Sequence, residues 1–291
     1  RRDEFYKELP FYAVKPLYTF TAFSFYKLGV PLIQCTVLPS TICFLFIGVF
    51  LLLWTKRYMS LPAACALCFL IMSTSIMLAI AKNSTPDCIS ALFIFGSVYF
   101  LVERKNIIWS TVFILLSTFA RIDNVIFACL LLGLIAITAN KSNQTRLRTG
   151  LLFIFLLAIS FFSTTLTVLP FHWSPLFYPN FAQSMNTSYS VHHSFTLHDY
   201  IEVAKSHFMT GLFFSNTALF IVLGYLALDK SPPGDDRHDL QNKILFLFLL
   251  AIMIRFVFQP IIDDRFYIGY YLCILCFLIK NQFSSRKVVR S

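Results

Sequence analysis

Charged side chains are scarce in this sequence. Asp, Glu, Lys and Arg together make up 13% of the 291 residues, whereas hydrophobic residues make up 57% and the mean hydropathy is +0.71. A soluble domain of this size needs more charge on its surface, so the composition excludes that class. Apolar runs of roughly 17–25 residues recur instead, and that length is typical of membrane-spanning helices.

The sequence also lacks the marks of a redox or zinc protein. Its eight cysteines all lie within or beside apolar segments and form no disulfide framework. Cys65 with Cys68, and Cys273 with Cys276, have CxxC spacing, but no His or acidic residues stand beside them. We interpret these cysteines as small packing residues in membrane helices.

No signal peptide, internal repeat or low-complexity segment is visible. The chain begins with Arg1-Arg2-Asp3-Glu4 rather than with Met, and this composition is typical of the middle of a protein. We therefore expect a further N-terminal piece, containing one more helix, upstream of these residues.

The apolar runs predict an all-α fold, a polytopic transmembrane helical bundle with about nine spans in a single integral membrane domain covering 1–291. The apolar stretch 107–139 is too long for one span, and we split it at 121–124, the segment that contains the charged residues Arg121 and Asp123. The expected spans are 30–54, 61–81, 88–102, 107–120, 125–139, 150–169, 211–228, 244–257 and 266–279.

Basic residues concentrate in alternate loops. The loops after the first, third, fifth, seventh and ninth expected spans hold 14 of the 24 Lys and Arg residues, which predicts that these loops are cytoplasmic. Nine of the 14 acidic residues lie on the opposite, outer face. The net charge of +10 therefore reflects orientation in the membrane, and nucleic acid is not an expected partner. We expect 1–28 to be an outer interfacial segment, 170–210 a long outer loop and 229–243 a cytoplasmic linker.

The outer face combines carboxylates with basic side chains at the edge of the bilayer, among them Arg121, Arg255 and Arg265. Ionisable groups at such a depth are costly and are commonly functional. Carboxylates can act as general bases or hold a metal ion, and arginines can bind a phosphate with two hydrogen bonds. This combination suits a lipid-phosphate substrate whose tail stays in the bilayer.

Five short segments resemble the GT-C superfamily of polytopic glycosyltransferases, in particular its bacterial members, which use polyprenyl-phosphate sugars as donors. The segments are 3–6 (DEFY), 14–18 (VKPLY), 85–87 (TPD), 121–124 (RIDN) and 264–267 (DRFY). The resemblance covers most of the chain. It departs from the family pattern where the first helix and the start of the first outer loop are absent, and where larger members carry a soluble C-terminal domain.

The resemblance and the residues together imply roles for eight side chains. Asp3 is expected to be the catalytic base, with Glu4 as its substitute, unless the base lies upstream of Arg1. Arg265 and Arg121 are expected to bind the substrate phosphate, with Asp264 orienting Arg265. The residues expected to line the site are Asp87, Asp123, Asp263 and Asp264.

Structural readings of the same residues stay open. Asp3 can belong to a frayed terminus, and Asp87 can be a helix start for which Thr85 is the N-cap. Arg121 and Asp123 can pair with each other at a helix break, and Arg255 can extend toward the interface instead of joining a site.

The implied reaction moves a sugar from a polyprenyl-phosphate carrier to a glycan, lipid or protein acceptor. It takes place on the outward face of a cell membrane, with a bacterial inner membrane favoured over the endoplasmic reticulum. No cofactor is assigned; a divalent metal stays open through His198 beside Asp199 in the long loop. One alternative is a transporter or flippase for a lipid-linked or anionic substrate, and another is a structural subunit without activity.

Overall fold

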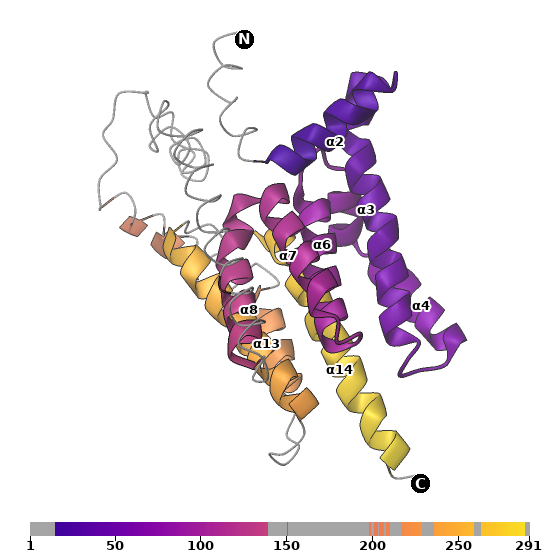
Figure 1. Ribbon diagram of the computed structural model, residues 1–291, viewed down its shortest axis with the longest axis vertical. Coiled ribbons are helices and arrows are strands. Elements are labelled where there is room, and N and C mark those ends of the chain that lie inside the picture. Colours follow the sequence, from indigo (N-terminus) through magenta and orange to yellow (C-terminus); the bar gives the residue numbers. More distant parts are fainter. Residues whose placement is uncertain are drawn as a thin grey trace.

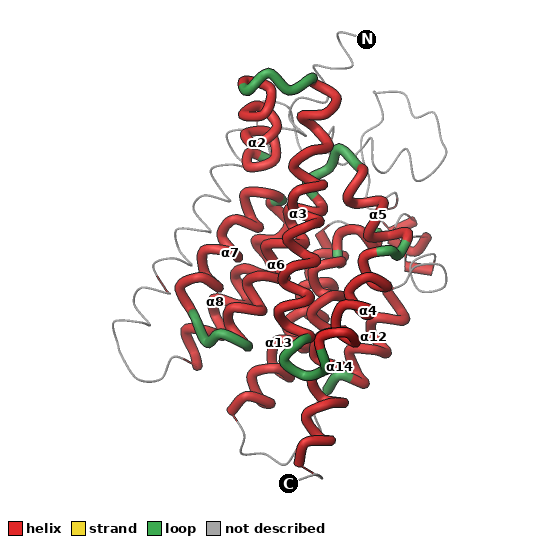
Figure 2. Tube along the Cα trace, turned by 90° about the vertical axis from the view of Figure 1, so that its right-hand side faces the viewer, coloured by secondary structure: helices red, strands yellow, loops and turns green. Residues whose placement is uncertain are grey.

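The computed structural model describes residues 15–138, 217–228, 236–258 and 263–288, with isolated positions between 150 and 209. Within these ranges the chain is helical and holds no strand, as the tube in Figure 2 shows. The expected all-α class is therefore confirmed for the described residues. The expected span 150–169 and most of the loop 170–210 lie outside them.

The longer helices lie side by side along the long axis of the molecule (Figure 1). Helix α2 lies at one end, and α14 runs toward the opposite end. The elements are α2 Pro16–Lys27, α3 Leu32–Thr55, α4 Leu61–Met72, α5 Ser75–Lys82, α6 Asp87–Val102, α7 Ile107–Ala120, η1 Ile122–Asn124, α8 Val125–Thr138, α12 Thr217–Leu226, α13 Asp236–Phe258, η3 Asp264–Phe266 and α14 Ile268–Val288.

Two described helices are long and apolar enough to cross a membrane, namely α3 and the Asp239–Val257 part of α13. The pair α4 and α5 makes a third if it is one broken span. Four further apolar helices are shorter: Asp87–Val102, Ile107–Ala120, Ile122–Ile137 and Ile268–Phe283. These helices indicate membrane association, but their lengths do not confirm nine spans.

The segment 61–81, expected to be one span, is bent by 66° between α4 and α5. The bend lies at Ser73 and Thr74, where Thr74 has extended backbone angles and its hydroxyl donates to the Ile71 carbonyl oxygen at 2.8 Å. Ser and Thr side chains can satisfy backbone groups that a continuous helix would otherwise pair, which explains the break here.

Two helices extend beyond their expected apolar limits. Helix α13 begins at Asp236, inside the segment 229–243 that was expected to be a linker, and α14 continues past position 279. The polar extensions are joined by buried Gln241, whose Nε2 donates to the Ala227 carbonyl oxygen at 3.0 Å and to Asn281 Oδ1 at 3.1 Å. Hydropathy alone misses such extensions because polar side chains support them.

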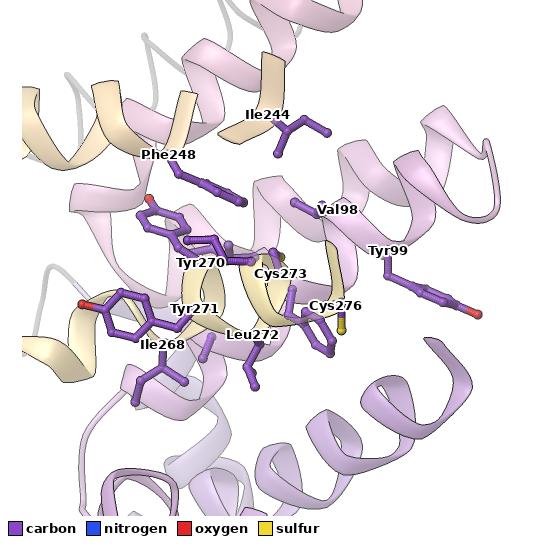
Figure 3. Packing of buried hydrophobic residues seen from close by; sticks show 14 of the residues in the cluster. Val98, Tyr99, Ile244, Phe248, Ile268, Tyr270, Tyr271, Leu272, Cys273 and Cys276 are labelled. Atoms are coloured by element: carbon purple, nitrogen blue, oxygen red, sulfur yellow. The ribbon is translucent and has the colours of Figure 1, made fainter. Parts of the chain in front are cut away.

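The core gathers around α14, which packs against α6 and α13 (Figure 3). Tyr270 of α14 stacks on Phe248 of α13 with ring centroids 4.7 Å apart, and Trp54 of α3 stacks on Phe95 of α6 at 5.3 Å. Helices α6 and α14 approach closely because Gly269 has no side chain facing Ile94 and the Ala91 carbonyl oxygen.

At the end of the bundle where α3 and α6 finish, Glu103, whose side chain is 6% exposed, gathers three side chains. Its carboxylate accepts hydrogen bonds from Trp54 Nε1 at 3.1 Å, Tyr58 OH at 2.6 Å and Arg57 Nη1 at 3.0 Å. The loops after the first and third expected spans therefore lie at the same end, as the alternation of the spans predicts.

Candidate functional site

Residues from four separate segments meet at the opposite end of the bundle. Asp87 is the first residue of α6, Arg121 and Asp123 lie at the break between α7 and α8, and Arg255 lies in the last turn of α13. Asp263 and Arg265 lie at η3, just before α14. We call Asp87, Arg121, Asp123, Arg255, Asp263 and Arg265 the arginine–aspartate cluster.

Arg121 joins two of the aspartates. Its Nε donates to Asp123 Oδ1 at 3.0 Å and its Nη2 donates to Asp123 Oδ2 at 2.9 Å, the two-bond geometry typical of arginine and carboxylate. Its Nη1 also donates to Asp87 Oδ1. The structural alternative for Arg121, its pairing with Asp123 at a helix break, is therefore present, and each of the three guanidinium nitrogens donates to a carboxylate.

The local sequence explains why Arg121 turns into the bundle. Helix α7 ends where Arg121 adopts an extended conformation, with φ −149° and ψ 123°. Buried Asn124 then fixes the turn, because its Nδ2 donates to Ser90 Oγ at 2.7 Å and to the Ser117 carbonyl oxygen at 2.8 Å. The helix break predicted at 121–124 is thus confirmed, and polar contacts to α6 and α7 hold it.

Arg255 was recognised in the sequence as a basic residue of the outer face but was given no role in the site, whereas the structure places it in the cluster. Its side chain is 7% exposed, so it does not extend toward the interface. Its Nε donates to Asp123 Oδ2 at 2.8 Å and its Nη1 donates to Tyr267 OH at 2.9 Å. The signal that could have found it was a lone arginine near the end of an otherwise apolar span, a pattern that usually needs a buried partner.

Arg265 forms the exposed edge of the cluster. Its Nε lies 2.6 Å from Asp263 Oδ2 and 3.9 Å from Asp87 Oδ2, and its side chain is 42% exposed. The ion pair therefore joins Arg265 to Asp263, whereas Asp264 was expected to orient it. Asp263 also accepts a hydrogen bond from the Arg265 backbone N–H at 3.2 Å, and Asp264 accepts a long one from Tyr271 OH at 3.5 Å.

One aromatic ring lies against all three arginines. The guanidinium carbons of Arg121, Arg255 and Arg265 are 4.1, 4.2 and 5.1 Å from the centre of the Phe266 ring. A guanidinium within about 6 Å of an aromatic face is attracted by the negative potential of that face. Phe266 therefore adds to the aspartates in holding the three guanidiniums near one another, a role that sequence reasoning did not assign.

Lys15, just before α2, adds a fourth basic group near the cluster. Burial and the positive charge of Arg121 lower its pKa to about 7, although Asp87 and Asp123 oppose the shift. The ammonium group therefore changes its charge near neutral pH, unlike an ordinary lysine.

Four buried side-chain atoms in the described part of the chain have no hydrogen-bond partner: Thr85 Oγ1, Gln241 Oε1, Arg255 Nη2 and Arg265 Nε. Arg265 Nε is close to Asp263, but that oxygen lies off the N–H direction. Thr85 is not the N-cap of α6, because Pro86 takes that position. Three of the four atoms thus belong to the cluster or to the turn beside Asp87.

The described residues locate neither the expected catalytic base nor a site for the metal that the sequence left open. Asp3 and Glu4, the expected catalytic residues, lie outside the described residues. Within the described ranges no three His, Cys, Asp or Glu side chains gather as metal ligands. Asp87, Asp123 and Asp263 face guanidinium groups, so arginine supplies their positive partners.

The cluster is a set of buried carboxylates and guanidiniums with one exposed edge, an arrangement that can bind an oxyanion and exchange it with solvent. In comparisons with known proteins, no family model, curated protein or solved structure matches the chain.

Proposed function

We propose that this chain is a membrane glycosyltransferase of the GT-C type, which moves a sugar from a polyprenyl-phosphate carrier to an acceptor. The observation that carries the proposal is the arginine–aspartate cluster. Five residues expected to bind phosphate or line a site, Asp87, Arg121, Asp123, Asp263 and Arg265, come from distant segments and gather at one end of an apolar helical bundle.

The phosphate of the carrier would bind Arg265 directly. The pair of Arg265 with Asp263 is partly exposed, with side chains 42% and 34% exposed. Such a pair contributes little stability, typically about 0–1 kcal/mol, so a phosphate can replace the carboxylate at low cost. The nitrogens of Arg121 already donate to Asp87 and Asp123, so Arg121 holds these carboxylates in place behind the exposed edge.

The remaining parts of the proposal follow the resemblance. Asp3, or Glu4 in its place, is the base that removes the proton from the acceptor hydroxyl. The chain has about nine spans, and its site faces outward from a cell membrane, a bacterial inner membrane in preference to the endoplasmic reticulum. The acceptor is a glycan, lipid or protein, and a divalent metal stays open.

One observation favours the alternative, a transporter or flippase. The 66° bend between α4 and α5 is a broken span or a re-entrant loop, and broken helices are typical of transporter binding sites. We rank this alternative second because the charged groups of the cluster gather at one end of the bundle and not at its middle.

The test measures sugar transfer by the protein, expressed in its full reading frame in membrane vesicles supplied with polyprenyl-phosphate sugars. Replacing Arg265 by Ala should lower the rate by about 100-fold or more, the usual effect of losing one donor that stabilises developing negative charge. Lys56→Ala, which removes a positive charge at the opposite end, is the matched control and should keep the wild-type rate.

Three other outcomes would change the conclusion. Equal rates for the wild type and Arg265→Ala would remove Arg265 from the site. A loss of transfer in both variants would indicate a general effect of charge. If no sugar is transferred but the lipid-linked substrate changes leaflets, the transporter alternative replaces the enzyme.

A further inference from the structure

Arg255 and Arg121 differ in how many of their guanidinium nitrogens donate hydrogen bonds. All three nitrogens of Arg121 donate to Asp87 or Asp123. Arg255 donates through Nε to Asp123 and through Nη1 to Tyr267, but Nη2 is buried and has no acceptor among the described residues. Native proteins rarely leave a buried N–H unpaired, so such a group calls for an explanation.

Unpaired polar atoms are not spread evenly through the described part of the chain. Besides Arg255 Nη2, Arg265 Nε in the same cluster and Thr85 Oγ1 beside Asp87 are buried without a partner. The guanidiniums of Arg255 and Arg265 lie against the same ring, Phe266, at 4.2 and 5.1 Å. Arg265 Nε is already 2.6 Å from Asp263 Oδ2, so the unused buried donor is Arg255 Nη2, beside the partly exposed guanidinium of Arg265. An oxyanion is the ligand that can accept from Arg255 Nη2 and lie against Arg265.

We infer that Arg255 is the second direct ligand of the phosphate, bonding one of its oxygens through Nη2 while Arg265 binds at the exposed edge. This assignment rests on the proposed function, and it gives Arg121 the role of a positioning residue. Arg121 fixes Asp123, and Asp123 fixes Arg255 with its Nη2 unoccupied. The binding site thus has a rigid inner arginine and an exposed outer one.

Burial of Arg255 makes the inner contact the more selective of the two. Its side chain is 7% exposed, whereas that of Arg265 is 42% exposed. A charge-assisted hydrogen bond is stronger where water competes less. A ligand that reaches Arg255 must also fit against the Phe266 ring, so the inner arginine distinguishes a phosphate that enters the cluster from one that touches its edge.

The experiment measures binding by the full-length protein in maltoside micelles, which carry no phosphate. The probes are a short prenyl phosphate, the matching uncharged prenol and inorganic phosphate. The wild type should bind prenyl phosphate more tightly than prenol. Arg255→Lys keeps the charge but removes Nη2, and it should weaken prenyl phosphate binding by about tenfold or more while leaving prenol binding unchanged.

Arg57→Lys is the matched control, because it makes the same change in an arginine paired with a buried carboxylate at the opposite end. It should keep the wild-type preference for the phosphate. An unchanged preference in Arg255→Lys would overturn the assignment of Arg255 and leave the proposed function standing. Equal losses for prenyl phosphate and prenol would show a structural role and also overturn it.

The remaining outcomes concern the ligand. A wild-type protein that binds prenol as tightly as prenyl phosphate has no phosphate site, and both the inference and the proposed function then fail. Inorganic phosphate, which has no lipid tail, tests the source of the phosphate. If it binds as tightly as prenyl phosphate, the assignment to a lipid carrier is overturned.

Discussion

Placing the charge of Arg255 in an apolar helix costs free energy, yet the proposed binding site requires this side chain. A charged residue in an apolar helix costs about 2.5–3.5 kcal/mol at the centre of a membrane, and less near its edge. Asp123 and Tyr267 offset that cost by accepting hydrogen bonds at 2.8 and 2.9 Å. Removing one partner of a buried ion pair typically costs about 3–5 kcal/mol because the other charge is left unpaired. Binding and stability therefore depend on the same contacts here.

Lys15 predicts a pH dependence of phosphate binding. Because its pKa in the folded protein is about 7, the lysine is charged below that pH and neutral above it. The charged groups near it are Arg121, Asp87, Asp123 and Arg265. An added phosphate favours the charged form, so binding above pH 7 takes up a proton. Affinity for prenyl phosphate should therefore fall as pH rises from about 7 to 9, by at most about tenfold per unit.

Titrations of wild type and Lys15→Arg across this range provide the measurement. A phosphate monoester is already fully ionised above about pH 7, so the ligand adds little slope of its own. Lys15→Arg should give a flat profile, because arginine stays charged. The same slope in both proteins would show that another group titrates. The linked effect on stability has the opposite sign: the unfolded lysine binds the proton that the folded one lacks, so stability rises with pH between about 7 and 10.5.

Individual site residues could be predicted where a charge interrupts an apolar run. Arg121, Asp123 and Arg265 stand out in this way, and the structure brings them together. The partners could not be predicted, because Asp123 and Arg255 are 132 positions apart. The choice between Asp263 and Asp264 depends on backbone angles, since Asp263 lies in an extended conformation at the N-cap of η3. The sequence alone cannot show which of two adjacent aspartates pairs with the arginine.

At the scale of elements, the sequence located helices well and their ends less well. The limits 30–54, 88–102 and 107–120 lie close to α3, α6 and α7. The bend between α4 and α5 could not be seen from hydropathy, because Ser73 and Thr74 leave the run apolar on average. The polar start of α13 was missed for the reverse reason, as buried Gln241 lowers hydropathy without ending the helix.

Close packing of α14 on α6 predicts a cost for adding one methyl group. A Cβ at Gly269 would lie 2.9 Å from Ile94 Cβ and 3.1 Å from the Ala91 carbonyl oxygen, and neither atom can swing aside. Gly269→Ala should therefore destabilise the fold by about 1–3 kcal/mol, although Ala is otherwise favoured in a helix. Thermal unfolding of the purified protein in micelles, followed by tryptophan fluorescence, measures the change.

Gly133→Ala is the control for this prediction. A Cβ at Gly133 in α8 has no neighbour within 4 Å, so the change should be neutral or stabilising by up to about 1 kcal/mol. If Gly269→Ala unfolds at or above the wild-type temperature, α14 can move away from α6 without cost, and the close approach does not hold the two helices in place.

At the scale of the molecule, the two ends differ in their polar contacts. Glu103 gathers Trp54, Arg57 and Tyr58 at one end, and the arginine–aspartate cluster lies at the other. The loops predicted to be cytoplasmic after the first and third spans meet at Glu103. The breaks predicted to be outer meet at the cluster. We therefore expect the cluster to face away from the cytoplasm.

Labelling of single cysteines tests this orientation. In a cysteine-free background, Asn83→Cys should react with a membrane-impermeant maleimide in intact cells, and Lys56→Cys should react only after the membrane is opened. Both positions are exposed in the structure, so the side of the membrane on which each cysteine lies decides whether the reagent reaches it. The reverse pattern would turn the cluster toward the cytoplasm and exclude an outward-facing site.

The distance along the chain between Asp123 and Arg255 has a consequence for synthesis. At about 5–20 residues per second, the 132 residues from position 124 to Arg255 take roughly 7–26 seconds to make. During that interval the aspartate exists before its distant partner. Arg121, two positions away, can neutralise it from the start. The neighbour can thus pair with the carboxylate during biogenesis, and the site is completed only when α13 and η3 have been made.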